Sequence, residues 1–225
     1  YSDDTGEIWS VTTREQDEYP SQYDKQGDAS TKESEAEFPA PPYAGDGGLE
    51  TSTQVAPTST PLADLLVAGE SQYLEFKSSA RWNKRREPPG IDKAIEHAIY
   101  KTVAGFLNSD GGVLIIGVND DGEPLGLSED IASLGSKSDL DGFELFLRDL
   151  LEANLSATTA GTVRTSFEII DEKDVCLVRV SRSGKPVYAK KLKESQKSEF
   201  WVRVGNATKQ LHGEDSDNYK KDHWV

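Results

Sequence analysis

The sequence predicts a mixed α+β domain that follows an acidic, polar tail. Apolar residues recur at helical spacing in two segments, at about 91–108 and 139–153. Shorter apolar or alternating runs between and after these segments are typical of strands. Because helical and strand segments interleave without alternating strictly, we expect a mixed β-sheet packed with two main helices.

The tail comprises residues 1–61, and its composition predicts disorder. The first 60 residues hold three basic and 13 acidic side chains, a net charge of −10. No apolar period of 2 or 3.6 is present, so the segment cannot bury enough apolar surface to offset its chain entropy. The simpler interpretation is a solvating linker. The alternative is an arm that docks on a partner or mimics nucleic acid through its acidic charge. The residues that would anchor it are Trp9, Tyr19, Tyr23 and Tyr43.

The domain is expected to comprise residues 62–225, and its first elements are short. Pro61-Leu-Ala-Asp-Leu-Leu predicts a helix with proline in the first turn, which Gly69 ends. The alternating segment 73–77 predicts a strand, and residues 80–90 predict a basic loop closed by Pro88, Pro89 and Gly90.

The centre of the domain predicts a long helix followed by a buried strand. The helix runs from about 91 to 108, and Asn108-Ser-Asp-Gly-Gly ends it. The apolar run 113–118 predicts the strand, and Asn119-Asp-Asp-Gly predicts a turn.

The C-terminal part predicts the second main helix, three strands and a closing helix. The helix at about 139–153 has an inward face made of Phe143, Phe146, Leu147, Leu150 and Leu151. The strands are expected at about 163–170, 174–181 and 198–205, and a short terminal helix near 214–223.

Composition excludes several classes of protein. The chain is 35% hydrophobic and 29% charged, and it lacks the run of about 18 apolar residues that a membrane span needs. A single cysteine, Cys176, excludes a disulfide scaffold and a cysteine-based zinc site. No methionine is present, so Tyr1 is not a translation start and we expect a fragment or a trimmed chain. No signal peptide is visible, and we expect a cytoplasmic protein without a membrane partner.

One group of residues is suited to metal-dependent hydrolysis of nucleic acid: Glu70, Glu75, Lys77 and Asp110. Glu75 and Lys77 lie two apart on a predicted strand and therefore share a face. Carboxylates can hold Mg²⁺ or Mn²⁺, and a lysine can stabilise charge on a phosphate. By spacing alone, however, the simpler interpretation is a solvated ion pair of Glu75 and Lys77 and a turn cap at Asp110.

Two basic patches are candidates for binding nucleic acid. The first directly follows the strand at 73–77 and the second lies late in the chain. The first comprises Arg81, Trp82, Lys84, Arg85 and Arg86. The second comprises Lys185, Lys190, Lys191, Lys193 and Lys197. An indole can stack on a base, and phosphate contacts beside a metal site are what a nuclease requires. Solvated lysine-rich loops are the alternative. The acidic balance weighs against a nucleic-acid partner, but residues 61–225 carry only 22 basic and 27 acidic side chains, or −5.

Three segments in order carry a family resemblance. They are Glu70-Ser-Gln-Tyr-Leu-Glu-Phe-Lys77, Ala104-Gly-Phe-Leu-Asn-Ser-Asp-Gly-Gly-Val-Leu-Ile-Ile-Gly-Val118 and Phe200-Trp-Val-Arg-Val-Gly-Asn-Ala-Thr208. Together they resemble the successive motifs of the Schlafen AlbA-type domain, and Asp120, Gly122 and Gly126 fit its turn. The resemblance spans about 65–211 and implies an α+β fold that binds nucleic acid.

The resemblance also implies a chemistry. In animal Schlafens, paired copies of this fold form a basic cleft that cuts transfer and ribosomal RNA. Their metal-binding carboxylates match Glu70, Glu75 and Asp110 of this sequence. This chain holds one copy, so a cleft would require a homodimer. The zinc site of the animal proteins has no counterpart, since only Cys176 is present.

These observations lead to one expected function and two alternatives. The first is a divalent-metal-dependent endoribonuclease that acts on structured RNA such as tRNA or rRNA, in a defence or stress response. The second is a non-catalytic DNA- or RNA-binding regulatory module of a larger protein. The third is a protein-interaction domain that its acidic tail regulates.

Overall fold

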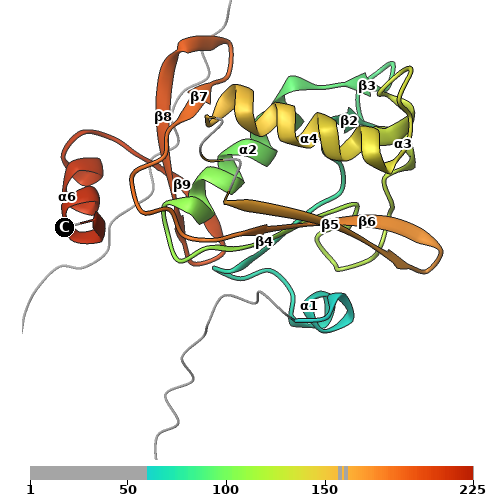
Figure 1. Ribbon diagram of the computed structural model, residues 1–225, viewed down its shortest axis with the longest axis horizontal. Coiled ribbons are helices and arrows are strands. Elements are labelled where there is room, and N and C mark those ends of the chain that lie inside the picture. The colour runs from blue at the N-terminus through green and yellow to red at the C-terminus, as the bar shows by residue number, and fades with distance from the viewer. Residues whose placement is uncertain (1–59, 157–158, 160–161, 225) are drawn as a thin grey trace, which may run out of the picture. The chain divides into compact units, whose positions relative to one another are not determined.

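The computed structural model describes residues 60–156, 159 and 162–224, which form a mixed α+β unit (Figure 1). The fold class predicted from the sequence is therefore confirmed. The predicted disorder of the tail concerns residues that lie outside this described part of the chain.

A four-stranded mixed sheet forms the centre of the unit, in the order β1-β4-β6-β5. β1 is parallel to β4, and the other neighbours are antiparallel. The strands are β1 Leu74–Lys77, β4 Gly112–Ile116, β5 Val163–Ile170 and β6 Lys173–Val180. Each lies within two residues of a strand that the apolar pattern predicts, because burial of these side chains drives both the pattern and the sheet.

The two main helices cover one face of this sheet (Figure 1). They are α2, Lys93–Leu107, and α4, Leu140–Asn154. Asp92 and Asp139 cap them, because their carboxylates accept the backbone N–H groups of Ala94 and Gly142. Between helices and sheet lies the larger core, which includes Ile99, Val103, Phe106, Leu114, Ile116, Phe143, Leu147, Cys176 and Val178.

The opposite face of the sheet carries the short helix α1, Leu62–Ala68 (Figure 1). Its Leu62 and Leu65 pack with Leu74 and Phe76 of β1 in a second core. Because successive side chains of a strand alternate between faces, Glu75 and Lys77 point to the side of α2 and α4. The fold therefore brings the two polar residues of β1 to the face where the second sheet lies.

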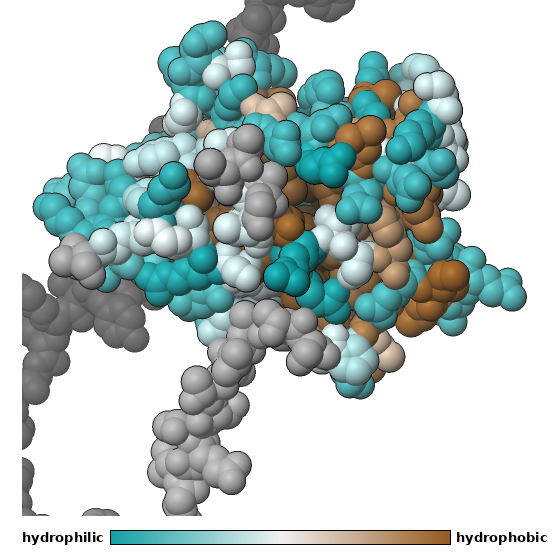
Figure 2. Space-filling view, in the orientation of Figure 1, coloured by the Kyte–Doolittle hydropathy of each residue, from teal (hydrophilic) through white to brown (hydrophobic). Residues whose placement is uncertain are grey.

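The second sheet has the order β7-β8-β9 and packs against α2. Its strands are β7 Ala189–Lys191, β8 Glu194–Val204 and β9 Ala207–Leu211, and α6, Gly213–Trp224, follows them. The closing helix and the strand at β8 were predicted from the sequence, whereas β7 and β9 were not. Figure 2 shows a largely hydrophilic surface with some apolar residues on the face in view.

The sequence prediction was wrong about the segment 80–90, which is not wholly a loop. It contains the two-residue strands β2, Trp82–Asn83, and β3, Gly90–Ile91, which pair with each other. The buried carboxylate of Asp130, in the unpredicted helix α3, Ser128–Ala132, accepts the backbone N–H groups of Ala80, Arg81 and Trp82. Because these hydrogen bonds come from a residue about 50 positions away, no local sequence pattern predicts them.

No helix in residues 60–156 or 162–224 has the length and apolarity that a membrane span requires.

Tight packing where α2 meets β4 yields a test of the fold. A Cβ added at Gly112 would lie 2.4 Å from the ring of Phe106 and 2.8 Å from the carbonyl oxygen of Tyr73. We expect Gly112→Ala to lower the free energy of unfolding by about 1–3 kcal/mol, measured by urea denaturation. The matched control is Gly184→Ala, because an added Cβ there has no neighbour within 4 Å. Equal stability of the two variants would contradict this packing.

Candidate functional site

The buried side chain of Arg203, on β8, joins distant parts of the chain. Its Nη1 donates to Glu75 Oε2 at 2.7 Å and to Thr208 Oγ1 at 3.0 Å. Its Nη2 donates to the carbonyl oxygen of Ser71 at 2.6 Å, and its guanidinium lies 4.9 Å from the ring centroid of Phe106. The side chain is only 2% exposed, so these contacts take the place of water around a permanent charge.

Arg203 was not among the site residues predicted from the sequence. It belongs to the segment Phe200–Thr208, which carries the family resemblance, but no local pattern shows which acidic residue it meets. Glu75 lies 128 positions earlier in the chain.

Glu75 and Lys77 form the predicted ion pair on one face of β1, through Glu75 Oε1. Since Arg203 occupies Oε2, both carboxylate oxygens of Glu75 accept from a cation of the protein. The side chain of Glu75 is 12% exposed and that of Lys77 is 27% exposed. The pair is therefore part of a partly buried cluster of three charges rather than a fully solvated pair.

The other two predicted carboxylates have different surroundings. Glu70 Oε1 accepts the backbone N–H of Phe76 at 2.8 Å, so this side chain closes the start of β1. Asp110 is 58% exposed, and its carboxylate lies 3.9 Å from Arg182. The turn after Asp110 needs glycine, because Gly111 has a φ of +80° and an added Cβ would lie 2.6 Å from the carbonyl oxygen of Val180.

These carboxylates do not fit a divalent cation as they are arranged. Mg²⁺ and Mn²⁺ need several free oxygen ligands that converge on one point. Both oxygens of Glu75 accept from cations, and one oxygen of Glu70 accepts from the backbone. Within the described part of the chain, no three histidine, cysteine, aspartate or glutamate side chains are placed to hold a metal ion. The predicted Mg²⁺ or Mn²⁺ stays a prediction.

Two members of the first basic patch are engaged within the protein. The side chain of Arg81 is 14% exposed, lies 3.4 Å from Glu96, and stacks on the ring of Phe146 at 4.5 Å. Arg86 Nη1 donates to the carbonyl oxygen of Ile91 at 3.1 Å. These contacts support the packing of α2, α4 and the β2–β3 hairpin. Arg81 is largely enclosed by them, whereas Arg86 remains exposed.

The other members of this patch line an open hollow of about 580 Å³. Trp82, Lys84 and Arg85 all contribute to its wall, together with residues of the turn after β4. Lys84 also pairs with Glu129 at 2.9 Å, and both of these side chains are well exposed.

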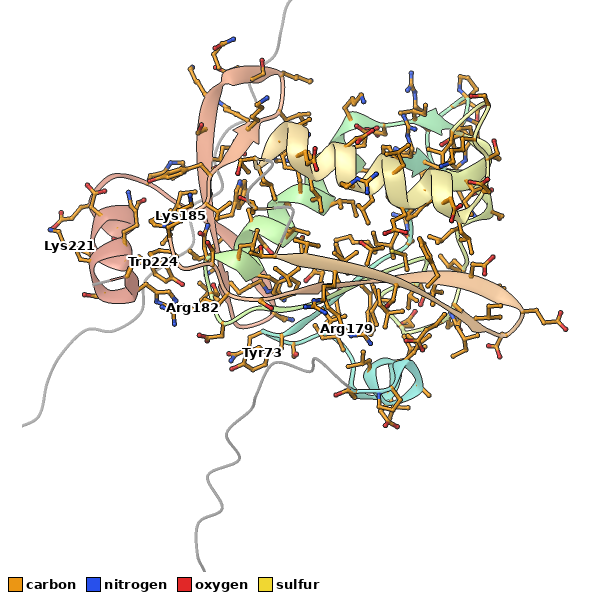
Figure 3. The ribbon with its side chains drawn as sticks, viewed as in Figure 1. Tyr73, Arg179, Arg182, Lys185, Lys221 and Trp224 are labelled. Carbon is orange, nitrogen blue, oxygen red and sulfur yellow. The ribbon has the colours of Figure 1, made fainter. Side chains whose placement is uncertain are left out.

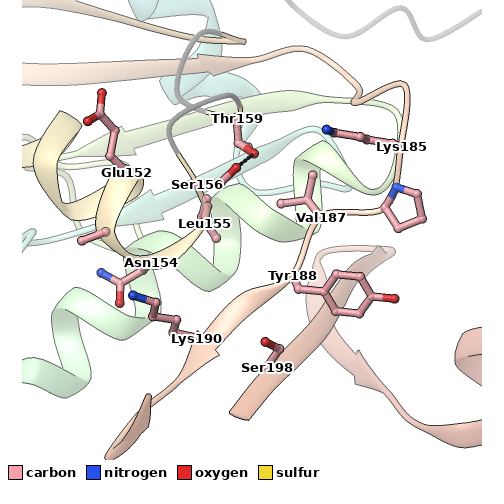
Figure 4. A pocket seen from close by; sticks show the side chains of 12 residues that line it. Glu152, Asn154, Leu155, Ser156, Thr159, Lys185, Val187, Tyr188, Lys190 and Ser198 are labelled. Atoms are coloured by element: carbon pink, nitrogen blue, oxygen red, sulfur yellow. Dashed lines mark hydrogen bonds between the residues drawn. The ribbon is translucent and has the colours of Figure 1, made fainter. Parts of the chain in front are cut away.

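The second basic patch lines a groove. Lys185, Tyr188 and Lys190 border a hollow of about 550 Å³ at the C-terminal end of α4 (Figure 4). Lys190 and Asn154 also border an adjoining hollow of about 210 Å³, together with Lys93, Lys191 and Lys193. The two hollows share Asn154 and Lys190 in their linings, and we call them together the lysine groove. The structure thus places Lys185, Lys190 and Lys191 along these two hollows, and their binding of nucleic acid stays a prediction.

The lysines of this region differ in how far they are neutralised. The Glu194 carboxylate accepts from both Lys191 and Lys197, and its hydrogen bond raises the pKa of Lys191. Lys185 and Lys190 form no ion pair with any described residue. Lys193, which is exposed and borders the smaller hollow, also forms none, so these three are the lysines of the groove most available to an anionic ligand.

α6 lies beside Asp110 and the end of β6. Arg182 donates to the carbonyl oxygen of His223, and the indole N–H of Trp224 donates to the carbonyl oxygen of Ser183 at 2.9 Å. Figure 3 shows Arg182, Lys185 and Trp224 gathered in this region. Burial and the nearby Arg182 guanidinium lower the pKa of His223, so the imidazole adds no positive charge there near neutral pH.

Comparisons with known proteins match most of the described domain. The family model described as Schlafen, AlbA_2 matches residues 70–212. The DIP2311 protein from Corynebacterium diphtheriae is similar in structure, with 18% sequence identity and a TM-score of 0.46 over 68% of this chain. The chain spans only 24% of that protein's length.

A second solved structure is the N-terminal domain of a protein from Nitrosomonas europaea named as related to the ATP-dependent DNA helicase RecG. Its sequence identity is 22% and its TM-score 0.42, over 69% of this chain and 95% of that domain. None of the curated proteins compared matches the chain.

The contacts of Glu75 predict a measurable loss of stability. Glu75→Gln removes the negative charge that compensates buried Arg203, and we expect the free energy of unfolding to fall by about 1–3 kcal/mol in urea denaturation. Asp110→Asn is the control, because this exposed carboxylate forms only a long contact with Arg182, and we expect a change within about 0.5 kcal/mol. A Glu75→Gln variant as stable as the control would show that the cluster does not hold the fold together.

Proposed function

The chain belongs to the Schlafen AlbA_2 family, and from this premise we propose that its domain binds nucleic acid through the lysine groove. Membership of the family indicates a function related to nucleic acid. The location of the binding surface is our proposal, and it rests on the contacts of individual lysines.

The lack of partners for Lys185 and Lys190 carries the proposal. The domain is acidic as a whole, and most of its other cations near the candidate sites are paired, as Lys77, Lys84, Lys191 and Arg203 are. Two unpaired lysines border the same hollow, and Glu152 is the one acidic residue among the described residues of its lining, so the wall of the hollow carries a net positive charge. Phosphate groups spaced along a backbone are the anions that such a groove suits.

Tyr188 favours a ligand with unpaired bases. Its side chain is 42% exposed at the edge of the groove, and Lys220 Nζ lies 3.3 Å from its hydroxyl. An exposed aromatic ring can stack on a base that is not held in a duplex. Structured RNA presents such bases in loops and bulges, so we propose RNA as the preferred ligand and single-stranded DNA as the next.

Charge reversal in the groove tests this function. We expect the double variant Lys185→Glu/Lys190→Glu to bind a fluorescent single-stranded RNA at least about tenfold more weakly at moderate salt, because two phosphate contacts are lost. The slope of log affinity against log salt should fall by about 1.4. The matched control is the double variant Lys173→Glu/Lys209→Glu, since it changes the net charge equally at two exposed lysines, on β6 and β9, that border neither hollow of the groove. An equal loss in the control would mean that only net charge matters.

Cleavage of RNA at a divalent metal ion is the second candidate function. One observation favours it: Arg203 draws together the segments that carry all three predicted carboxylates. It bonds Glu75 and the carbonyl oxygen of Ser71, which follows Glu70, and its backbone N–H donates to Ser109 Oγ, next to Asp110. Binding of Mg²⁺ or Mn²⁺ would require Glu75 to leave its cations. This candidate also includes a homodimer, so that two copies of the domain face one substrate.

Asp110→Asn is the variant that tests cleavage, because Glu75→Gln would also destabilise the fold. Purified protein is incubated with total tRNA, single-stranded DNA or duplex DNA, in Mn²⁺, Mg²⁺ or EDTA. Cleavage predicts metal-dependent fragments that Asp110→Asn loses, together with a dimer in sedimentation velocity. Intact but retarded nucleic acid in every lane would leave binding as the function.

A further inference from the structure

The hollow beside Trp82 is separate from the lysine groove and has a different chemistry. It lies where β1 ends, between the β2–β3 hairpin and the turn that follows β4. Its volume is about 580 Å³, which is ample for one nucleobase. We call it the Trp82 pocket, and the lining residues that matter are Ser78, Trp82, Arg85, Ile95, Asp120 and Leu125.

Trp82 has a fixed backbone and an unpartnered ring. Its backbone N–H donates to Ser79 Oγ at 2.7 Å and to Asp130 Oδ1 at 3.0 Å. The carboxylate of Asp130 is itself buried. No described residue, by contrast, accepts from the indole N–H or stacks on the half-buried ring. An indole on a fixed backbone, with no ring partner among the described residues, is suited to stacking on a planar ligand.

Apolar side chains from two elements complete the wall of the pocket. Ile95 comes from the first turns of α2, and Leu125 is 38% exposed in the loop after β4. With the indole they form apolar surface that is open to solvent. Covering such surface with an aromatic ligand is favourable.

Only some polar groups of the pocket are free to select a ligand. The amides of Asn83 and Asn119 are already bonded to Asp92 and Glu123. No described residue forms a hydrogen bond or an ion pair with the carboxylate of Asp120 or the guanidinium of Arg85, and both side chains are exposed. The pocket therefore offers one free carboxylate as acceptor and one free cation.

A carboxylate discriminates among the bases. Guanine carries two adjacent donors, N1–H and N2–H₂, which the two oxygens of one carboxylate can accept together. On the same Watson–Crick edge, adenine has an acceptor, N1, beside its N6–H₂ donor. Uracil and cytosine each have one donor group on this edge. Arg85 at the mouth of the pocket suits the phosphate attached to such a base.

We propose that the Trp82 pocket binds a guanine base that is turned out of a single-stranded segment, with the base stacked on Trp82 and its donor edge on Asp120. The proposal rests on the proposed function, because it deepens nucleic-acid binding into a preference for guanine. The lysine groove would hold phosphates of the same strand without regard to sequence.

Three RNA heptamers test the preference: all uridine, or uridine with one central guanosine or adenosine. We expect wild-type protein to bind the guanosine heptamer most tightly. Trp82→Ala should weaken that binding by about tenfold or more, and Trp82→Phe by less than about threefold, because phenylalanine keeps a stacking surface. Asp120→Asn should remove the preference for guanosine over adenosine, since an amide presents one acceptor and one donor. Asp120 is exposed, so this variant is expected to fold normally.

The outcomes separate this inference from the proposed function. In one outcome Trp82→Ala and Asp120→Asn bind the guanosine heptamer as the wild type does, while Lys185→Glu/Lys190→Glu does not. Guanine binding at the Trp82 pocket is then overturned, and RNA binding at the lysine groove is supported. If no heptamer binds, quenching of tryptophan fluorescence by guanosine 5′-monophosphate decides. Saturable quenching that Trp82→Phe abolishes supports the pocket without the groove, and its absence overturns both.

Discussion

The buried ion pair between Arg203 and Glu75 is the interaction on which the rest of the described domain depends. A guanidinium taken out of water is stable only when its donors are satisfied, and all three nitrogens of Arg203 reach an acceptor. These acceptors lie on or just before β1, except Thr208 on β9, so the pair locks β8 and β9 against the central sheet. The β7–β8 hairpin, which carries Lys190, takes its position from the same strand.

The residues that stabilise the fold, around Glu75 and Arg203, differ from those that we propose to bind a ligand. Glu75 cannot neutralise Lys77 and Arg203 and at the same time offer free oxygens to a metal ion. Any cleavage at this cluster would therefore compete with stability. The lysine groove and the Trp82 pocket carry no such conflict, because Lys185, Lys190 and Asp120 are exposed and form no ion pair with any described residue. Binding at the lysine groove, as we propose it, would therefore cost the fold less stability than binding of a metal ion at Glu75.

In this domain the net charge does not predict where an anionic ligand can bind, whereas the pairing of each cation does. A net charge of −5 for residues 61–225 argues against a nucleic-acid partner if it is treated as uniform. Screening limits such a field to about 8–10 Å at physiological salt, so nearby groups dominate. Lys185 and Lys190 border one hollow and form no ion pair within the described part of the chain. Arg81 is equally basic, but it pairs with Glu96 and stacks on Phe146.

The sequence by itself determined the α+β class, the two main helices and the four strands of the central sheet, because burial of apolar side chains at a regular period is a local property of the chain. It also determined that Glu75 and Lys77 share a face, since they are two residues apart on one strand. Only the tertiary structure decided that Arg203 completes this pair, that Asp130 pins the β2–β3 hairpin, and that Asp120 faces the same hollow as Trp82. These contacts join residues about 40 to 130 positions apart, and their energies depend on distances that no periodic pattern encodes.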